Sequence, residues 1–170
     1  MTEETTTAPE AATEAPNEPK FTVQRIYLKD LSYETPQGAE GFQKQWQPKV
    51  NQDLNTSTSK IEEGLFEVAL RVTITVTDGD DTIYLVEVEQ AGLFTATGFS
   101  DQQLAQVLNT TCPSMLFPYA REVIDNVLVK GCFPPLMIPP INFDALFASA
   151  VQRAQANAAK ESETSDDTTH

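Results

Sequence analysis

The amino-acid sequence predicts a domain of the α+β class, with strands in its first part and helices in its last. Two observations carry this prediction. Apolar and polar residues alternate over residues 65–77 and again over 82–90, and this period of two is typical of half-buried antiparallel strands. Beyond residue 98 the apolar residues recur at the spacing of a helix. Strands followed by helices are typical of α+β folds.

The first two expected strands are less regular. Residues 21–33 are rich in β-branched and aromatic side chains, which favour a strand, and a shift of the apolar phase near Gln24 and Arg25 indicates a β-bulge. Residues 35–48 contain two prolines and two glycines, so we expect a long loop there. Residues 50–60 are polar and rich in Thr, Ser and Asn, which predicts a weakly amphipathic strand toward an edge of the sheet.

The clearest element is a hairpin over residues 65–90. Every even position from 66 to 76 is apolar, Asp78-Gly79 tolerates the positive φ of a tight turn, and the return strand keeps the same register. Its buried face carries Tyr84, Val86 and Val88. Its opposite face carries Ile83, Leu85, Glu87 and Glu89. Taken alone, such a mixed apolar and acidic face is more often plain solvated sheet than a docking surface.

Two helices are expected directly after the sheet. Ser100 and Gln103 have the spacing of a capping box, and the helix that they begin is expected to end where Cys112-Pro113 interrupts the apolar period. A second helix is expected from near Pro118, with Gly131 as its C-terminal cap.

An apolar run with four prolines separates the second helix from a third. Because proline has no backbone N–H to donate, residues 131–140 cannot be a sheet strand or the interior of a helix. We expect an extended connector that either packs as a lid or lines a groove for another apolar chain. Asn142 is then a good N-cap for the third helix, whose apolar positions 143, 146, 147, 150 and 151 share one face.

The composition excludes several classes of function. With a net charge of -14 and a pI near 4.3, the chain repels phosphate backbones and anionic lipids, whereas basic partners fit its charge. We therefore expect no nucleic-acid binding. The sequence holds no run long enough to span a membrane, and its first residues do not follow the order of a signal peptide, so we expect a cytoplasmic protein without direct membrane insertion.

The sequence contains few of the residues and motifs that enzymes use for catalysis. Cys112 and Cys132 are too far apart for a clustered metal site, and the only histidine, His170, is the last residue. The common general base for a Ser or Cys nucleophile is therefore missing, and no phosphate-binding loop, dinucleotide fingerprint or nucleophile elbow is present. We expect no enzyme activity, no metal and no cofactor, and we interpret both cysteines as small buried core residues.

Both ends of the chain lack bulky apolar side chains. Residues 1–19 and 154–170 consist mainly of Thr, Glu, Ala, Ser and Asp, and they cannot offset the entropy of ordering by burial. We expect two disordered acidic tails around a single domain over residues 20–153. An acidic tail can also dock a basic partner, but simple solvation is the more frequent role.

Several short segments carry a resemblance to a known family. They are Arg25-Ile26-Tyr27 with Lys29-Asp30, Phe42-Gln43-Lys44, Trp46-Gln47-Pro48, Cys112-Pro113, Leu116-Phe117-Pro118-Tyr119-Ala120-Arg121-Glu122 and Asn142-Phe143-Asp144-Ala145-Leu146-Phe147. In this order and spacing, over residues 21–151, they closely resemble SecB, the bacterial protein-export chaperone. The resemblance implies a four-stranded antiparallel sheet backed by helices, in a homotetramer built as a dimer of dimers. The short helices alone would give the hairpin's even face little cover, which also favours burial against a second copy.

The resemblance implies a chaperone that uses no ATP. It would bind unfolded preproteins in exposed apolar grooves, keep them competent for translocation, and deliver them to the SecA motor of the Sec pathway. The groove would lie between the loop 35–48 and the last helix. Its expected residues are Phe42, Trp46, Leu136, Met137, Ile138, Phe143, Leu146 and Phe147. Without the resemblance, packing as a lid over the sheet is the simpler interpretation of Phe143 and Phe147.

The resemblance assigns two further sets of residues. The basic, zinc-carrying C-terminal segment of SecA would dock on Asp30, Glu34, Leu85 and Glu87. Within each strand the two residues have the same parity, so each pair can point to one face. Alternate residues of the fourth strand would influence assembly of the oligomer, namely Tyr84, Val86, Val88 and Gln90.

Two other functions stay open on the sequence alone. A carrier or enzyme would hold one small hydrophobic ligand in the same groove, with Cys132 or Tyr119 acting chemically, and it would need a closed pocket. A SecB-like chaperone dedicated to one toxin–antitoxin client would have narrow specificity. A general export chaperone instead needs open apolar grooves that adapt to many sequences.

Overall fold

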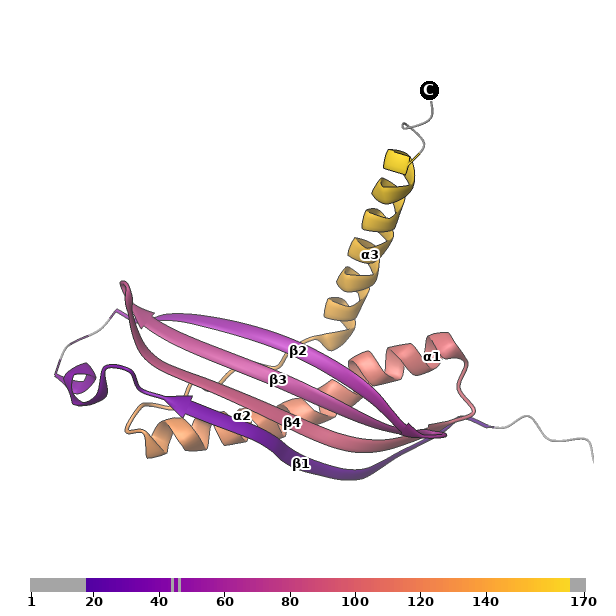
Figure 1. Cartoon of the computed structure of the whole chain (residues 1–170). Coiled ribbons are helices and arrows are strands. Elements are labelled where there is room, and N and C mark those ends of the chain that lie inside the picture. Colours follow the sequence, from indigo (N-terminus) through magenta and orange to yellow (C-terminus); the bar gives the residue numbers. More distant parts are fainter. Residues whose placement is uncertain (1–17, 44, 46, 166–170) are drawn as a thin grey trace, which may run out of the picture.

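A four-stranded antiparallel sheet forms one layer of the structure (Figure 1). The computed structural model describes residues 18–43, 45 and 47–165, and for 158–165 it describes the backbone only. The strands are β1 (Lys20–Glu34), β2 (Lys49–Glu62), β3 (Leu65–Asp78) and β4 (Asp81–Thr97), in the sheet order β1-β4-β3-β2. The helices follow the strands along the chain, so the predicted α+β fold with a four-stranded antiparallel sheet is confirmed.

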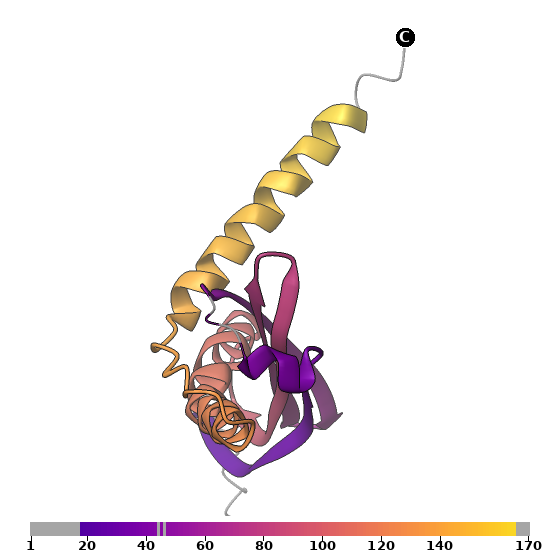
Figure 2. The same cartoon turned by 90° about the vertical axis from the view of Figure 1, so that its left-hand side faces the viewer.

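Helices cover one face of the sheet. The helix α1 (Asp101–Gln106), the π-helical turn η2 (Val107–Thr111) and the helix α2 (Cys112–Lys130) follow one another along that face, and we call them the helix layer. A connector, residues 131–142, leads to α3 (Phe143–Ser165), which projects away from both layers (Figures 1 and 2). In the described part of the chain, no helix is both long enough and apolar enough to cross a membrane.

The two irregular strands lie at the edges of the sheet. The pairing of β1 with β4 shifts between Val23 and Arg25, which confirms the predicted bulge. The prediction that residues 50–60 form a strand toward the sheet edge is also confirmed, because β2 is the last strand of the described sheet and pairs there with β3. Between them, the loop that we expected over residues 35–48 contains a short 3-10 helix, η1 (Gly38–Phe42).

The core lies between the sheet and the helix layer. Fully buried residues of the hairpin are Val68, Leu70, Val72, Ile74, Val86 and Val88. Along α2, fully buried residues recur at every fourth position, namely Cys112, Leu116, Ala120, Ile124 and Leu128. The expectation that this face of the hairpin has little cover within one chain is therefore wrong, because a single long helix spans it.

The helix break predicted at Cys112-Pro113 does not occur. The turn η2 widens instead, so that the N–H of Cys112 bonds to the carbonyl oxygen of Val107, and Pro113 falls in the first turn of α2, where no donor is needed. Pro118 lies inside α2 rather than at its start. Because proline has no N–H, it cannot donate a hydrogen bond to the carbonyl group of Ser114 one turn earlier. Both residues are on the exposed side of α2, where water can reach that carbonyl group.

The end of α2 differs in detail from the prediction. Gly131 is the C-terminal cap, but the left-handed residue is Cys132, with φ of 63°. Glycine is required at 131 for another reason, since a Cβ there would lie 1.9 Å from the hydroxyl oxygen of Tyr33. The interpretation of both cysteines as buried is right for Cys112 and wrong for Cys132, which is exposed.

The start of α3 follows the prediction, and its end lies further along the chain. The side-chain oxygen of Asn142 accepts a hydrogen bond of 3.0 Å from the N–H of Ala145, as an N-cap does. The helix continues to Ser165 and so includes part of the segment 154–170, whose composition we interpreted as a disordered tail. Ala, Gln, Lys and Glu in that segment are strong helix formers. The expected N-terminal tail lies almost entirely outside the described residues.

The strand β4 continues to Thr97, although we expected it to end near Gln90. Gly92 is not a strand terminator here, because it makes room for an aromatic ring. A Cβ at position 92 would lie 2.6 Å from Cε2 of Phe94 and 3.1 Å from Cδ2 of Leu116. The glycine therefore leaves room for the ring of Phe94 and for the side chain of Leu116.

Gly92→Ala is expected to lower the free energy of unfolding by about 1–3 kcal/mol, the usual cost of forcing an extra methyl group into a packed core. Urea unfolding measures this change. In a Phe94→Leu background the same substitution should cost less, because the ring that meets the new methyl group is gone. Equal costs in the two backgrounds would contradict this explanation.

Candidate functional sites

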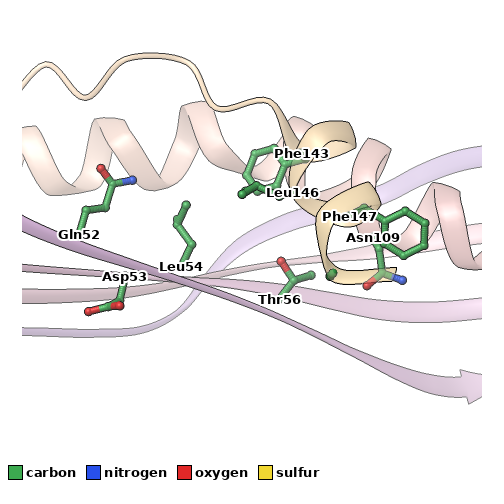
Figure 3. A pocket seen from close by; sticks show the side chains of 9 residues that line it. Gln52, Asp53, Leu54, Thr56, Asn109, Phe143, Leu146 and Phe147 are labelled. Atoms are coloured by element: carbon green, nitrogen blue, oxygen red, sulfur yellow. The ribbon is translucent and has the colours of Figure 1, made fainter. Parts of the chain in front are cut away.

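A partly apolar cleft of about 420 Å³ lies between the edge strand β2 and the first turns of α3 (Figure 3). Its apolar lining consists of Leu54, Phe143, Leu146, Phe147 and Ala150. Its polar lining consists of Gln52, Asp53, Thr56 and Asn109. The cleft therefore unites an exposed sheet edge with the apolar stripe of the last helix.

Each wall of the cleft follows from a local feature of the chain. On β2, Leu54 and Thr56 point toward the helices and Asp53 points away, as alternation along a strand requires (Figure 3). On α3, the ring of Phe143 is only 5% exposed and meets Phe117 edge to face at 6.1 Å. Phe143 therefore anchors the helix, so the interpretation as lid packing fits it.

The next residues of α3 are placed differently from this anchor. Leu146 is 48% exposed and Phe147 is half-buried. Both side chains line the cleft, Leu146 near Phe143 and Phe147 near Asn109 of η2 (Figure 3). They form an apolar wall that solvent can reach, which a lid packed on the sheet would not leave open.

Four of the other five predicted groove residues lie outside this cleft. In the connector, Ile138 is buried, Leu136 packs partly against the core, and Met137 is 72% exposed. Phe42 is 52% exposed and its ring lies 5.2 Å from that of Phe133. Trp46 lies outside the described residues. The structure thus brings together three of the eight predicted residues, namely Phe143, Leu146 and Phe147.

The sequence did not single out the β2 side of the cleft or Asn109. Leu54 is the one large apolar residue between residues 51 and 60, and this isolated apolar position in a polar edge strand was the available signal. Nothing local marks Asn109, because its approach to α3 depends on how the last helix packs.

The four residues assigned to SecA docking lie on the outer face of the sheet, which we define as the face away from the helix layer. In the register of β1 and β4, Glu34 lies directly opposite Leu85, and Glu87 lies opposite Ser32. Asp30 pairs with Glu89 on the same face. The two strands therefore place both pairs side by side, although they are about fifty residues apart in the chain.

A network of ion pairs crosses the outer face. Lys29 contacts Glu67 at 2.8 Å and Glu89 at 3.5 Å, and Arg71 contacts Glu89 at 2.5 Å. Hydrogen bonds from Lys29 and then Tyr27 lower the pKa of Glu67, and the hydrogen bond from Arg71 lowers the pKa of Glu89. These carboxylates therefore stay ionised well into acidic solution.

Glu87 belongs to the same network but keeps part of its surface open. Its Oε2 accepts a hydrogen bond of 2.9 Å from the hydroxyl group of Thr73, and its Oε1 lies 3.8 Å from Nε of Arg71. The side chain of Glu87 is 29% exposed. Asp30 and Glu34 are exposed at the neighbouring edge strand. The outer face can therefore offer oriented carboxylates to a cationic partner.

The residues assigned to oligomer assembly lie inside the single chain. Tyr84, Val86, Val88 and Gln90 are all buried under the helix layer. Burial raises the pKa of Tyr84 to about 12. The side-chain oxygen of Gln90 is buried and has no hydrogen-bond partner among the described residues. Any influence of these residues on assembly would have to pass through the packing of the helix layer.

The structure gives no support to a chemical role for the residues named in the enzyme alternative. Cys132 and Tyr119 are both exposed and neither lines the cleft. The other cysteine, Cys112, is fully buried, and burial raises the pKa of its thiol to about 12, so it stays protonated at neutral pH. Among the described residues, no three His, Cys, Asp or Glu side chains gather where they could hold a metal ion.

Comparison with known proteins identifies the family. Residues 14–154 match the model of the SecB family, the preprotein translocase subunit SecB. The chain is 52% identical over 150 residues to the protein-export protein SecB of Cellvibrio japonicus, covering 88% of this chain and 90% of that protein. It is 53% identical over 150 residues to the protein-export protein SecB of Hahella chejuensis, covering 88% of this chain and 94% of that one.

A solved structure supports the fold. A SecB-like chaperone of Mycobacterium tuberculosis, in complex with a peptide from the HigA1 antitoxin, matches with a TM-score of 0.57 and 18% identity over 71% of this chain and 90% of that one. The family match and the two close relatives confirm what the short segments of sequence predicted. The chain belongs to the SecB family, the cytoplasmic, non-enzymatic chaperones of the Sec protein-export pathway.

Proposed function

We propose that this chain holds unfolded preproteins in the cleft between β2 and α3 and passes them to SecA through the outer face of its sheet. The observation that carries the proposal is the solvent-accessible apolar wall of Leu146 and Phe147 beside an edge strand. A folded protein hides its apolar segments, whereas an unfolded preprotein presents them. Binding of this kind selects clients by exposure and needs no nucleotide.

Each cleft should bind only weakly. Apolar burial contributes about 25 cal/mol per Å², and ordering a flexible client opposes it. Several clefts on one oligomer change the result, because the second segment of a client binds at a high effective concentration once the first is held. A long unfolded chain is then retained while each of its segments exchanges.

A homotetramer, built as a dimer of dimers, would supply these several clefts. Exposed apolar side chains on the helix side of the sheet support burial against a second copy. Leu28 and Leu31 of the edge strand β1 face the helix side, since they pair with the buried residues Gln90 and Val88. The outward side of α2 exposes Met115, Tyr119 and Val129.

The docking of SecA would use the outer face, on the opposite side of the sheet from the helix layer. Its carboxylates Asp30, Glu34 and Glu87 complement a basic segment, and Leu85 adds an apolar contact between them. The zinc ion that such a segment carries belongs to SecA. Because exposed charges attract one another less in salt, this docking should weaken as ionic strength rises.

Native mass spectrometry of the purified full chain, mixed with a reduced and unfolded preprotein or with its folded form, tests the proposal. We expect a tetramer that binds the unfolded form and leaves the folded form free. Binding to both forms, or to one compact apolar ligand only, would contradict the proposal. Binding of one client and refusal of other unfolded chains would favour a dedicated chaperone instead.

A further inference from the structure

The connector has few ways to be held by backbone hydrogen bonds. Between residues 134 and 140, only Leu136, Met137 and Ile138 have a backbone N–H, because the other four residues are prolines. Two of these three N–H groups donate to the same carboxylate oxygen of Asp125 on α2, from Leu136 at 2.9 Å and from Met137 at 3.2 Å. Asp125 is therefore the main hydrogen-bonding anchor of the proline-rich run.

A second residue of α2 continues this attachment. One turn before Asp125, the guanidinium group of Arg121 donates to the carbonyl oxygen of Ile138 at 3.2 Å. One turn earlier still, the ring of Phe117 packs against Phe143, the first residue of α3. Residues 117, 121 and 125 are four apart and share one side of α2. We call these three residues the rail, along which the connector runs back toward the middle of the helix.

The rail also holds the connector in an unusual conformation. Met137 has φ of 51°, in the left-handed region that costs a non-glycine residue energy. Successive N–H groups around such a residue form a concave site for an anion, and the carboxylate of Asp125 occupies it. Because Asp125 binds both N–H groups at once, it stabilises the bend.

The rail holds the connector from which α3 starts, and α3 forms one wall of the cleft. Beyond its first turns this helix projects away from the body (Figure 2), so among the described residues it is held mainly by the connector and by its packing against η2. We propose that Arg121 and Asp125 are positioning residues for client binding, which act by fixing the connector and through it the wall of Leu146 and Phe147. This inference rests on the proposed function.

Asp125→Leu removes both acceptor oxygens at similar volume and provides the test in the full-length oligomer. Hydrogen exchange at the amides of Leu136 and Met137 should accelerate by about tenfold or more, because two bonds to a charged acceptor are lost. Dissociation of an unfolded, fluorescently labelled preprotein should accelerate several-fold. Asp125→Asn keeps one acceptor oxygen, so amide exchange and client dissociation should both be slower than in Asp125→Leu. The matched control is Glu122→Leu, at an exposed position of α2 whose side chain bonds to Asn126 of the same helix.

A combined variant separates positioning from general stability. If Asp125 acts through the wall, Asp125→Leu should not accelerate dissociation further once Leu146 and Phe147 are both alanine. An additive effect on dissociation would overturn the inference. Two results for Asp125→Leu alone would also overturn it: amide exchange that does not change, or amide exchange that accelerates while client dissociation does not. Should Asp125→Leu fail to fold, Arg121→Met is expected to accelerate both rates less strongly, and unchanged rates there would overturn the inference too. If the unaltered chain binds no unfolded preprotein, the proposed function fails, whereas the exchange measurement still decides whether Asp125 holds the connector.

Discussion

Replacing Leu146 and Phe147 together by alanine is expected to weaken the binding of an unfolded preprotein by about a hundredfold. Each side chain loses roughly 1.5 kcal/mol of apolar burial against the client, and about 3 kcal/mol corresponds to two powers of ten in affinity. Several clefts on one oligomer would enlarge this effect, because every segment of the client is held less well. The folded chain should remain stable, since Leu146 is exposed and Phe147 only half-buried.

Fluorescence titration with a labelled, unfolded preprotein measures this loss. Phe143→Ala serves as the contrasting variant, because Phe143 is buried and its removal should lower the free energy of unfolding by about 3–5 kcal/mol. Loss of binding with unchanged thermal stability would distinguish a binding wall from core packing. If the double variant binds clients as well as the unaltered chain does, the cleft is not the client site.

Replacing Glu87 by lysine is expected to abolish docking of SecA while client binding stays intact. The substitution places a cation among the carboxylates that should attract the basic segment of SecA. It also brings the new ammonium group close to Arg71, whose Nε lies 3.8 Å from Oε1 of Glu87 in the unaltered chain. Leu85→Lys should act in the same way through the neighbouring position. Surface plasmon resonance with the C-terminal segment of SecA at several salt concentrations measures the loss.

The control for this variant must change the net charge by the same amount elsewhere. Asp80→Lys does so at the exposed turn between β3 and β4, away from the residues of the docking surface. We expect only a small loss with this control, because charges beyond the Debye length of about 8–10 Å are screened. Equal losses for Asp80→Lys and Glu87→Lys would mean that the overall negative charge, and not the outer face, attracts SecA.

The sequence predicted the sheet well because its patterns are local. Alternation over residues 65–77 identified the half-buried strand, the phase shift at Gln24 identified the bulge, and Ser100 with Gln103 identified a capping box that the structure contains. Each of these signals depends on neighbours within a few residues of the chain. None of them requires knowledge of what packs across the core.

The helix layer was predicted less well, because long-range packing overrides local rules there. Pro113 and Pro118 indicated a break, and a proline inside a helix costs roughly 3 kcal/mol. Burial of each large apolar side chain against the sheet contributes about 1.5–3 kcal/mol, and α2 buries Leu116, Ile124 and Leu128 fully. One continuous helix is therefore the more stable arrangement, and Gly92 could remain in β4 because the same helix covers the ring of Phe94.

For the candidate sites too, some features could be predicted from sequence patterns, and others depended on how the chain packs. The residues of a few short segments were enough to identify the family and to predict that the last helix contributes to the groove. Only the folded chain could separate the anchor Phe143 from the exposed wall of Leu146 and Phe147, add the edge strand β2 to the cleft, and attach the connector to Asp125. Burial and contact across the core depend on where distant segments meet, and that information is present in the chain only once all its elements have packed together.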